Sequence, residues 1–340
     1  GYEAEFSLKA CAERLAQLLE KPVKFVPDCV GEQTQAAVAA LKDGEVALLE
    51  NLRFYPGEGK NDEKFSKQLA SLADVYVNDA FGTSHRDAAS MTGVPLLLKG
   101  GVAGYLVQKE VAIIHRALKN PGHPFVAVLG GAKVSDKIFV IKNLLSLVDE
   151  ILVGGAMAYT FMKAAGLEIG SSRCETVVVD KKGKEKAVLK MAQEILDLAK
   201  AKGKKIILPI DHVVANKVEA GAKTKVVEQL EAGWMGVDIG PKTRELFTKK
   251  LAEAKTALWN GPMGVFEIKG MDEGTSTIAR TFAEITAKGA TTIVGGGDSA
   301  AAIRQLGFDS KVTHVSTGGG AALEMFEGKY LPGIAALDLK

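Results

Sequence analysis

The residues best suited to chemistry lie where apolar runs give way to glycine-rich segments. Lys133 and Lys137 follow the run Phe125-Val-Ala-Val-Leu129 and a pair of glycines. A helix that begins there places both ammonium groups on one face, beside free backbone N–H groups, which suits a polyphosphate. The segment is not the G-x-x-x-x-G-K-[ST] phosphate loop. Spacing alone supports equally well a solvated lysine pair on a surface helix.

A second glycine cluster carries an acid. The segment Gly295-Gly-Gly-Asp-Ser299 ends another apolar run. Asp298 either caps the following helix by accepting a backbone N–H or holds Mg²⁺ beside phosphate oxygens, and the motif alone favours the cap. A third glycine-rich segment runs from Trp259 to Glu267. Its acid, Glu267, either accepts from a ribose hydroxyl or is a surface carboxylate.

The first half of the chain places arginines after two apolar runs. Arg53 and Arg86 either converge on one anion with bidentate geometry or form separate surface ion pairs, which spacing alone favours. His85 is a second candidate donor to the same anion. The sequence has no G-x-S-x-G motif and no cysteine framed by glycine and histidine, so covalent catalysis is not indicated. The remaining chemistry is electrostatic and is typical of phosphoryl transfer.

Composition narrows the class of protein. A chain of 340 residues predicts two domains, and 47% hydrophobic with 25% charged residues indicates a globular protein. A net charge of +2 from interspersed acids and bases argues against nucleic acid as a partner. The longest apolar run, 151–162, is too short to cross a bilayer. Three widely spaced cysteines predict buried free thiols in a reducing compartment, hence a cytoplasmic protein.

Short β-type runs alternate with helical stretches, which predicts an α/β fold with parallel sheets. Ser7 is predicted to cap a helix that ends at Leu19, and 171–185 is predicted to be a surface loop. A helix at 104–118 is predicted to join the two domains. Strands are expected at 23–26, 46–49, 75–77, 125–129, 151–153, 205–209, 257–259, 291–294 and 313–316, and further helices at 33–41, 63–72 and 186–200.

Taken together, seven segments resemble phosphoglycerate kinases and occur in that family's order over essentially the whole chain. The resemblance implies two Rossmann-like domains with parallel sheets facing an interdomain cleft. It also implies reversible phosphoryl transfer from 1,3-bisphosphoglycerate to ADP, as in glycolysis, gluconeogenesis or carbon fixation, with Mg²⁺ as cofactor. The segments are 50–54, 79–86, 129–137, 233–242, 259–267, 295–298 and 314–321.

The resemblance further implies a hinge-bending monomer in the cytoplasm, or in a plastid if a transit peptide has been removed. Residues 1–104 would bind 3-phosphoglycerate and 121–327 would bind ADP or ATP. A helix at 105–120 would join these domains, and a tail at 328–340 would pack back on the first. No nucleic acid or membrane partner is expected.

The resemblance also assigns roles to single residues. Lys133 would neutralise the phosphoryl group in flight, and Gly319 and Gly320 would lie at the helix start facing that group. Asp298 would bind Mg²⁺. The substrate ligands would be Arg53, His85 and Arg86, and the nucleotide contacts would be Gly131, Lys137, Gly154, Gly240, Asn260, Glu267, Gly296, Gly297, Asp298 and Ser299.

The family opens with a segment that carries an Asp-Phe-Asn motif, a catalytic arginine and a His-Leu-Gly-Arg stretch. None of these occurs in this sequence. The alternative interpretation is therefore a nucleotide-binding fragment without turnover. A dinucleotide-dependent dehydrogenase is disfavoured, because neither half shows G-x-G-x-x-G after its first strand.

Overall fold

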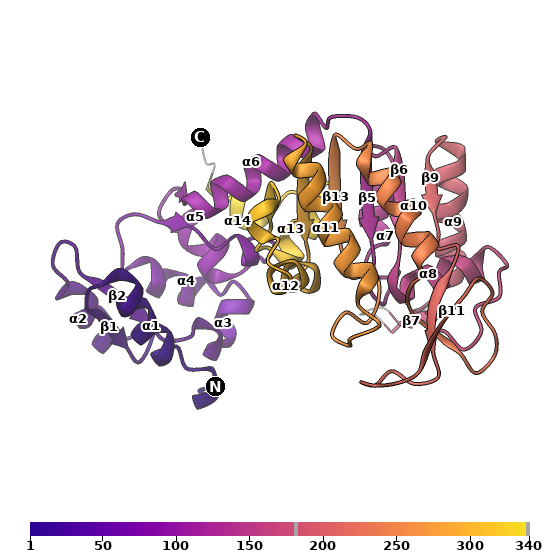
Figure 1. Cartoon of the computed structure of the whole chain (residues 1–340). Coiled ribbons are helices and arrows are strands. Elements are labelled where there is room, and N and C mark those ends of the chain that lie inside the picture. Colours follow the sequence, from indigo (N-terminus) through magenta and orange to yellow (C-terminus); the bar gives the residue numbers. More distant parts are fainter. Residues whose placement is uncertain (180–182, 338–340) are drawn as a thin grey trace. The chain divides into compact units, whose positions relative to one another are not determined.

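The computed structural model describes residues 1–179 and 183–337 and divides into two compact units (Figure 1). Unit 1 contains Gly1–Lys109 together with the C-terminal residues from Tyr330, and unit 2 contains Glu110–Lys329. The boundary lies inside helix α6 (Tyr105–Lys119). Among the described residues, no helix combines the length and apolar character needed to cross a membrane.

Unit 2 is built on a six-stranded parallel sheet in the order β15-β14-β13-β5-β6-β9. The chain extends the sheet in one direction through β5, β6 and β9, then returns to add β13 on the other side of β5. The direction therefore reverses between β5 and β13, and ligands of open α/β sheets bind outside the carboxyl ends of strands at such a reversal. The strands are β5 (Phe125–Leu129), β6 (Glu150–Val153), β9 (Lys205–Ile207), β13 (Thr256–Asn260), β14 (Thr291–Gly295) and β15 (His314–Val315).

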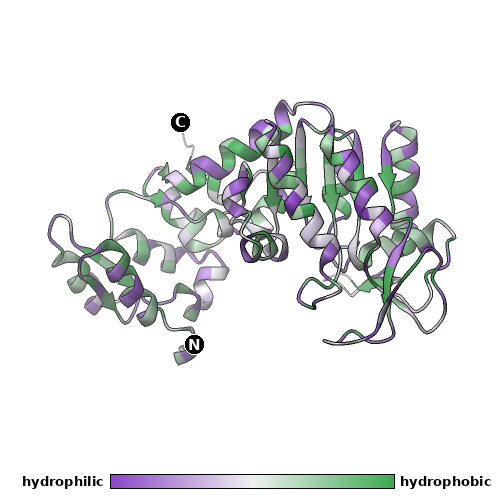
Figure 2. Ribbon diagram, viewed as in Figure 1, coloured by the Kyte–Doolittle hydropathy of each residue, from purple (hydrophilic) through white to green (hydrophobic). Residues whose placement is uncertain are grey.

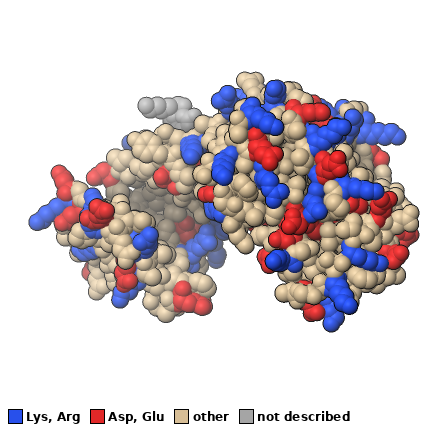
Figure 3. All heavy atoms as spheres, in the orientation of Figure 1, with Lys and Arg blue, Asp and Glu red and all other residues tan. Residues whose placement is uncertain are grey.

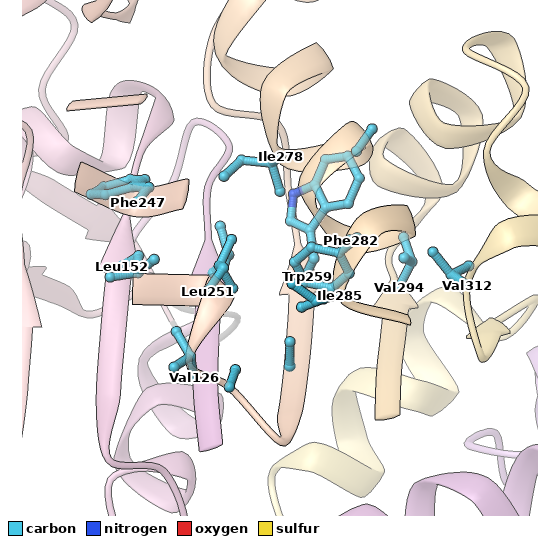
Figure 4. Close-up of a cluster of buried hydrophobic side chains, with 14 of the residues drawn as sticks. Val126, Leu152, Phe247, Leu251, Trp259, Ile278, Phe282, Ile285, Val294 and Val312 are labelled. Atoms are coloured by element: carbon cyan, nitrogen blue, oxygen red, sulfur yellow. The ribbon is translucent and has the colours of Figure 1, made fainter. Parts of the chain in front are cut away.

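The central strands β5 and β13 are buried along their whole length, as expected for parallel strands covered on both faces. Figure 2 shows this sheet as predominantly apolar and the surrounding helices as banded with hydrophilic residues. Trp259 and Phe282 pack with their ring centroids 5.8 Å apart in the core cluster of Figure 4. The Trp259 indole N–H donates to the carbonyl oxygen of Gly261 at 2.8 Å, so the core also fixes the start of the loop after β13.

Helices connect the strands of unit 2, and two smaller sheets accompany them. An antiparallel sheet has the order β11-β10-β12, with β10 (His212–Ala215), β11 (Thr224–Val227) and β12 (Met235–Ile239). Figure 3 shows basic and acidic side chains interspersed over the visible face. The helices are α7 (Ile138–Leu144), α8 (Gly155–Ala164), α9 (Val188–Ala201), α10 (Pro241–Ala252), α11 (Glu273–Ala287), α12 (Gly297–Gln305) and α13 (Gly319–Phe326).

The predicted loop at 171–185 is wrong in part. Strand β7 (Val177–Val179) lies inside it and pairs antiparallel with β8 (Glu185–Ala187). Three successive β-branched valines favour an extended strand even where it is exposed, and their polar flanks had suggested a loop. Residues 180–182 of the predicted loop lie outside the described residues.

Unit 1 has two separate parallel strand pairs in place of one continuous sheet. The C-terminal α14 (Pro332–Ala335) is held within this unit, because the amide of Asn78 donates to the Gly333 carbonyl at 2.9 Å. The other elements are α1 (Lys9–Leu19), β1 (Val23–Val26), α2 (Glu32–Ala39), β2 (Val46–Leu49), α3 (Pro56–Gly59), α4 (Glu63–Ala70), β3 (Val77–Asn78), α5 (Val94–Leu97) and β4 (Val102–Ala103).

Two sequence predictions in unit 1 need correction. Helix α1 begins at Lys9 with Leu8 as its N-cap, and the acceptor comes from Glu50, which accepts from the Leu8 N–H at 2.8 Å and the Ser7 hydroxyl at 2.7 Å. Ser7 thus lies one position before the N-cap, where its hydroxyl donates to the buried Glu50 carboxylate and accepts a long contact of 3.4 Å from the Lys9 N–H. Of the cysteines, Cys29 is buried, but Cys11 is exposed.

Candidate active site

The segments that follow β5 and β13 form one platform at the reversal point of the large sheet. The Gly130 N–H donates to the Asn260 carbonyl and the Gly131 N–H donates to the Pro262 carbonyl, both at 2.9 Å. A Cβ atom at Gly130 would lie 2.1 Å from the Pro262 oxygen, so this approach requires glycine. Residues near 130 and near 260 are therefore brought together by backbone contacts.

A cavity of about 360 Å³, here called the lysine cavity, opens at this platform. Its walls come from the segment after β5, the segment after β13, the start of α12 and one residue of α13. Most of the predicted phosphate-binding and metal-binding residues share it. The lining residues are Gly131, Ala132, Lys133, Asp136, Lys137, Asn260, Gly261, Gly296, Gly297, Asp298, Ser299 and Leu323.

Lys137 and Asn260 meet in the lysine cavity, where the Lys137 ammonium donates to the Asn260 side-chain oxygen. Burial lowers the pKa of Lys137 to about 8, although the carboxylates of Asp136 and Asp298 act in the opposite direction. Asn260 is 2% exposed, and its side-chain N–H₂ has no acceptor among the described residues. An unpaired buried donor costs free energy, so both groups favour an anion that supplies acceptor oxygens.

The sequence predicts that both lysines lie on one helix, and this prediction is wrong. Helix α7 begins at Ile138 with Lys137 as its N-cap, and Lys133 lies in the preceding loop. Within this loop, Ser135 donates through its N–H at 3.0 Å and its hydroxyl at 2.6 Å to the Glu175 carboxylate. Lys133 is exposed and forms no ion pair with the described residues. The loop, not helical spacing, brings both lysines to one cavity.

The start of α12 supplies the opposite wall. Its N-cap is Gly296, with φ +89°, and the space above Gly297 is open. Asp298 does not cap the helix, because it lies two positions beyond the N-cap and makes no capping hydrogen bond. Its carboxylate is thus left free beside the N–H groups of the first turn. Ser299 ties this wall to the platform, since its hydroxyl oxygen accepts from the Gly261 N–H at 2.6 Å.

A second cavity of about 370 Å³, here called the apolar cavity, shares Gly131, Ala132 and Asp298 with the lysine cavity. Glu267, a predicted ribose contact, is one of its polar groups. The other lining residues are Gly155, Ala156, Tyr159, Arg173, Val218, Met235, Gly236, Val237, Asp238, Pro262, Met263, Gly264 and Val265.

Most residues that line the apolar cavity were not predicted as site residues, and Tyr159, Arg173 and Gly236 are among them. A Cβ atom at Gly236 would lie 1.8 Å from the Tyr159 hydroxyl oxygen, so the strand can approach this ring only with glycine. A glycine between Met235 and Val237 inside a strand is the signal that could have located this wall. Nothing in the sequence around Arg173 marked it.

Four predicted glycines line neither cavity. Gly154 and Gly240 are packing positions, because added Cβ atoms would lie 2.5 Å from the Met263 sulfur and 2.3 Å from the Asp211 carboxyl carbon. Gly319 and Gly320 occupy the first two positions of α13, which reaches the lysine cavity through Leu323 one turn later.

The segment before α13 is held by a buried carboxylate of α6. Glu110 Oε1 accepts from the N–H of Thr317 at 2.7 Å and from its hydroxyl at 2.8 Å, while Oε2 lies 2.7 Å from His314 Nε2. Burial alone would raise the pKa of Glu110, but the hydrogen bonds from His314 and Thr317 outweigh it and lower that pKa. This carboxylate therefore stays ionised and positions the residues that lead into Gly319 and Gly320.

Unit 1 has its own candidate anion site. Arg53 and Arg86 line one cavity of about 620 Å³, and both are exposed without ion pairs to the described residues. The side chain of Asn51 holds the turn that leads into Arg53, since its Oδ1 accepts from the Arg53 N–H at 3.0 Å. His85 does not line this cavity, and its Nδ1 is buried without a partner among the described residues.

Comparisons with known proteins give one family. The family model described as phosphoglycerate kinase matches residues 1–329. A phosphoglycerate kinase of Thermosipho africanus is 54% identical over 339 residues, covering 99% of this chain and 82% of the relative. The solved phosphoglycerate kinase of Coxiella burnetii is 40% identical with a TM-score of 0.85, covering 99% of this chain and 82% of that one. Similar relatives are named as cytosolic in Triticum aestivum and chloroplastic in Volvox carteri.

Proposed function

The chain belongs to the phosphoglycerate kinase family and is a phosphoryl-transfer enzyme, and we propose that its nucleotide site is the pair of cavities at the reversal point of the large sheet. Its reaction is reversible transfer of a phosphoryl group from 1,3-bisphosphoglycerate to ADP, which gives 3-phosphoglycerate and ATP. No comparison favours the alternative of a nucleotide-binding fragment without turnover.

The observation that carries the site assignment is the pair formed by Lys137 and Asn260. A lysine whose pKa is lowered by burial and an amide donor without an acceptor lie together in the lysine cavity. Phosphate oxygens would supply acceptors to both groups, and the start of α12 adds free N–H groups. The adjoining apolar cavity then takes the nucleoside, with Glu267 as the ribose contact.

The residues present fit a magnesium ion that arrives with the nucleotide. Asp298 lines both cavities, and its carboxylate is neither a helix cap nor part of an ion pair with described residues. Within 1–179 and 183–337, no group of three or more His, Cys, Asp or Glu residues could hold a metal alone. Mg²⁺ commonly takes one or two carboxylates and completes its shell with phosphates and water. When bound, it neutralises charge on the phosphate oxygens.

In a direct in-line transfer, Lys133, Arg53 and Arg86 would each contact a phosphoryl or phosphate group. Lys133 is exposed in the lysine cavity, where its ammonium would stabilise the charge on the migrating phosphoryl oxygens. Arg53 and Arg86 would hold the 3-phosphate of the acid in unit 1. Because the two substrates bind to different units, transfer requires a hinge-bending step. We also propose that the enzyme acts as a monomer, in the cytoplasm or a plastid.

The test is Lys133→Ala, measured as kcat and KM for ADP and 1,3-bisphosphoglycerate. We expect kcat to fall by about 10²-fold with little change in the KM for ADP, because the contact is made mainly in the transition state. Lys142→Ala, which removes an exposed lysine of α7 outside both cavities, should leave kcat unchanged. Weaker ADP binding with an unchanged kcat would contradict this role.

A further inference from the structure

One buried carboxylate of unit 1 has no part in the chemistry described above. Glu58 is 7% exposed and lines the cavity of about 620 Å³ that contains Arg53 and Arg86, here called the arginine cavity. Burying a carboxylate costs free energy, and a negative charge beside an anion site also opposes the binding of the anion. Contact with the anion therefore does not explain why an acid lies here, and its hydrogen bonds indicate another role.

Both oxygens of Glu58 contact a single residue, Ser90. Oε2 accepts from the Ser90 N–H at 3.0 Å, and Oε1 accepts from the Ser90 hydroxyl at 2.6 Å. In the described part of the chain, Glu58 forms no ion pair. The carboxylate therefore links α3 to the segment around Ser90 by two hydrogen bonds.

Glu58 is connected to Arg53 by two successive backbone turns. The Tyr55 N–H donates to the Leu52 carbonyl at 3.1 Å, and the Glu58 N–H donates to the Tyr55 carbonyl at 3.1 Å. Arg53 lies within the first of these turns. The contact between Glu58 and Ser90 therefore also fixes the backbone of Arg53.

Ser90 is connected in a similar way to Arg86, which lies four residues before it. The Met91 N–H donates to the Ala88 carbonyl at 3.0 Å, so the chain between them is a hydrogen-bonded turn. The hydroxyl of Tyr76 donates to the Ser90 carbonyl at 2.8 Å and holds this segment from the other side. The carboxylate contact thus joins the two segments that carry the arginines of the cavity.

Two guanidinium groups bind one phosphate tightly only when supporting residues hold them in the productive geometry. We propose that Glu58 is a positioning residue for the acid substrate, which holds the segments of Arg53 and Arg86 at the separation that one phosphate group requires. The reach of its side chain to Ser90, and not its negative charge, performs this task. The inference rests on the proposed binding of 3-phosphoglycerate in unit 1.

Three substitutions separate reach from charge. Glu58→Gln loses the charge, but its amide can accept from the Ser90 N–H and donate to the Ser90 hydroxyl oxygen, so both contacts are kept. Glu58→Asp keeps the charge but is one methylene shorter, and Glu58→Ala removes the group. We expect the Kd and KM for 3-phosphoglycerate to rise about tenfold in Glu58→Asp and Glu58→Ala, as when one of two charged contacts to the phosphate is lost, and to change less than about twofold in Glu58→Gln.

The Kd is measured by equilibrium titration without turnover, and the KM in the direction that consumes ATP. The KM for ATP, which binds in unit 2, should not change in any of the variants. Glu13→Ala is the matched control, because Glu13 is an exposed glutamate of α1 outside the arginine cavity. The Asn61 amide donates to Asp87 at 2.9 Å, which joins the same two segments and should keep the variants folded.

Ser90→Ala tests the same contact from its other side, because it removes only the hydroxyl donor, and should weaken 3-phosphoglycerate by about two- to fourfold. This variant decides the question if Glu58→Ala does not fold. Equal losses in Glu58→Gln and Glu58→Ala would mean that the charged carboxylate contacts the substrate, which overturns the proposal. Wild-type binding that neither Glu58→Asp nor Glu58→Ala alters rejects the inference alone, whereas wild-type protein that does not bind 3-phosphoglycerate contradicts the proposed function as well.

Discussion

The carboxylate of Glu110 is buried in unit 2 and accepts hydrogen bonds through both of its oxygens. It is fully buried, and its two oxygens contact His314 and Thr317 at 2.7–2.8 Å. Glu110→Gln keeps the shape and one carbonyl acceptor but replaces the other oxygen with a donor and removes the charge. Since a hydrogen bond to a charged group contributes about 1.5–3 kcal/mol, we expect Glu110→Gln to destabilise unit 2 by about 2 kcal/mol.

Glu110→Ala removes both oxygens and leaves the Thr317 donors and His314 unpaired in the core. Each buried donor left without an acceptor costs about 1–3 kcal/mol, so losing the Thr317 and His314 contacts together should cost about 3–5 kcal/mol. A unit of this size loses about 2–4 °C of Tm per kcal/mol, so Tm should fall by about 4–8 °C in Glu110→Gln and by about 6–20 °C in Glu110→Ala. Differential scanning calorimetry measures both shifts. Glu194→Gln, an exposed glutamate of α9, is the matched control and should change Tm by less than about 1 °C.

The same contact predicts a dependence on pH. The pKa of Glu110 is lower in the folded chain than its ordinary value of 4.5. Its stabilisation is therefore present above that value and is lost as the pH falls through the folded pKa. The Tm difference between wild type and Glu110→Gln should shrink as the buffer is taken from pH 7 toward pH 3. A difference that stays constant, or a Glu110→Ala variant with an unchanged Tm and kcat, would refute the reasoning.

Two further predictions concern the lysine cavity. Calorimetric titration of Asp298→Asn with ADP should show weaker binding in the presence of Mg²⁺ and nearly unchanged binding in EDTA. The reason is that the substitution removes the proposed metal ligand, whereas Asp298 makes no capping hydrogen bond that could be lost. Equal weakening under both conditions would exclude a metal role. ADP affinity of the wild type should fall as the pH rises from 7 to 9, because Lys137 loses its proton through a pKa of about 8; Lys137→Met should bind ADP more weakly at pH 7 and lose this dependence.

Most strands of the large sheet could be predicted from the sequence, because buried parallel strands are short, apolar and β-branched. The run at 125–129 matches β5 in both bounds, and 291–294 differs from β14 by one residue. The predicted start at 63 matches that of α4, which has the local N-cap Asp62, but at other helix starts the acceptor comes from a distant residue and could not be predicted. Glu50 supplies the acceptor at α1, and Asp79 supplies one at α6 through the Leu106 N–H at 2.7 Å. Propensity within a segment contains no information about such partners.

The site residues could be predicted from the sequence only where local sequence determines their surroundings. Glycine clusters after apolar runs indicated where ligands approach, but the sequence could not separate open positions from packed ones. Gly297 has open space around it, whereas Gly240 is closed against Asp211. That distinction depends on which atoms a Cβ would meet, and these come from elements far away in the chain. Arg173 was missed because its place at the cavity depends on backbone bonds to residues 234 and 236.

Strand order, more than any single motif, brings together the residues of the proposed nucleotide site. Lys137 and Asn260 are 123 residues apart in the chain, and they touch because β13 is added beside β5 after the chain reverses direction. Had β13 followed β9 at the edge of the sheet, β6 and β9 would separate the two strand ends. Adjacent strands lie about 4.8 Å apart, so the lysine and amide would then be separated by about 14 Å. The buried amide donor and the lysine with a lowered pKa would have no common cavity, and each sequence motif would be present without forming a site.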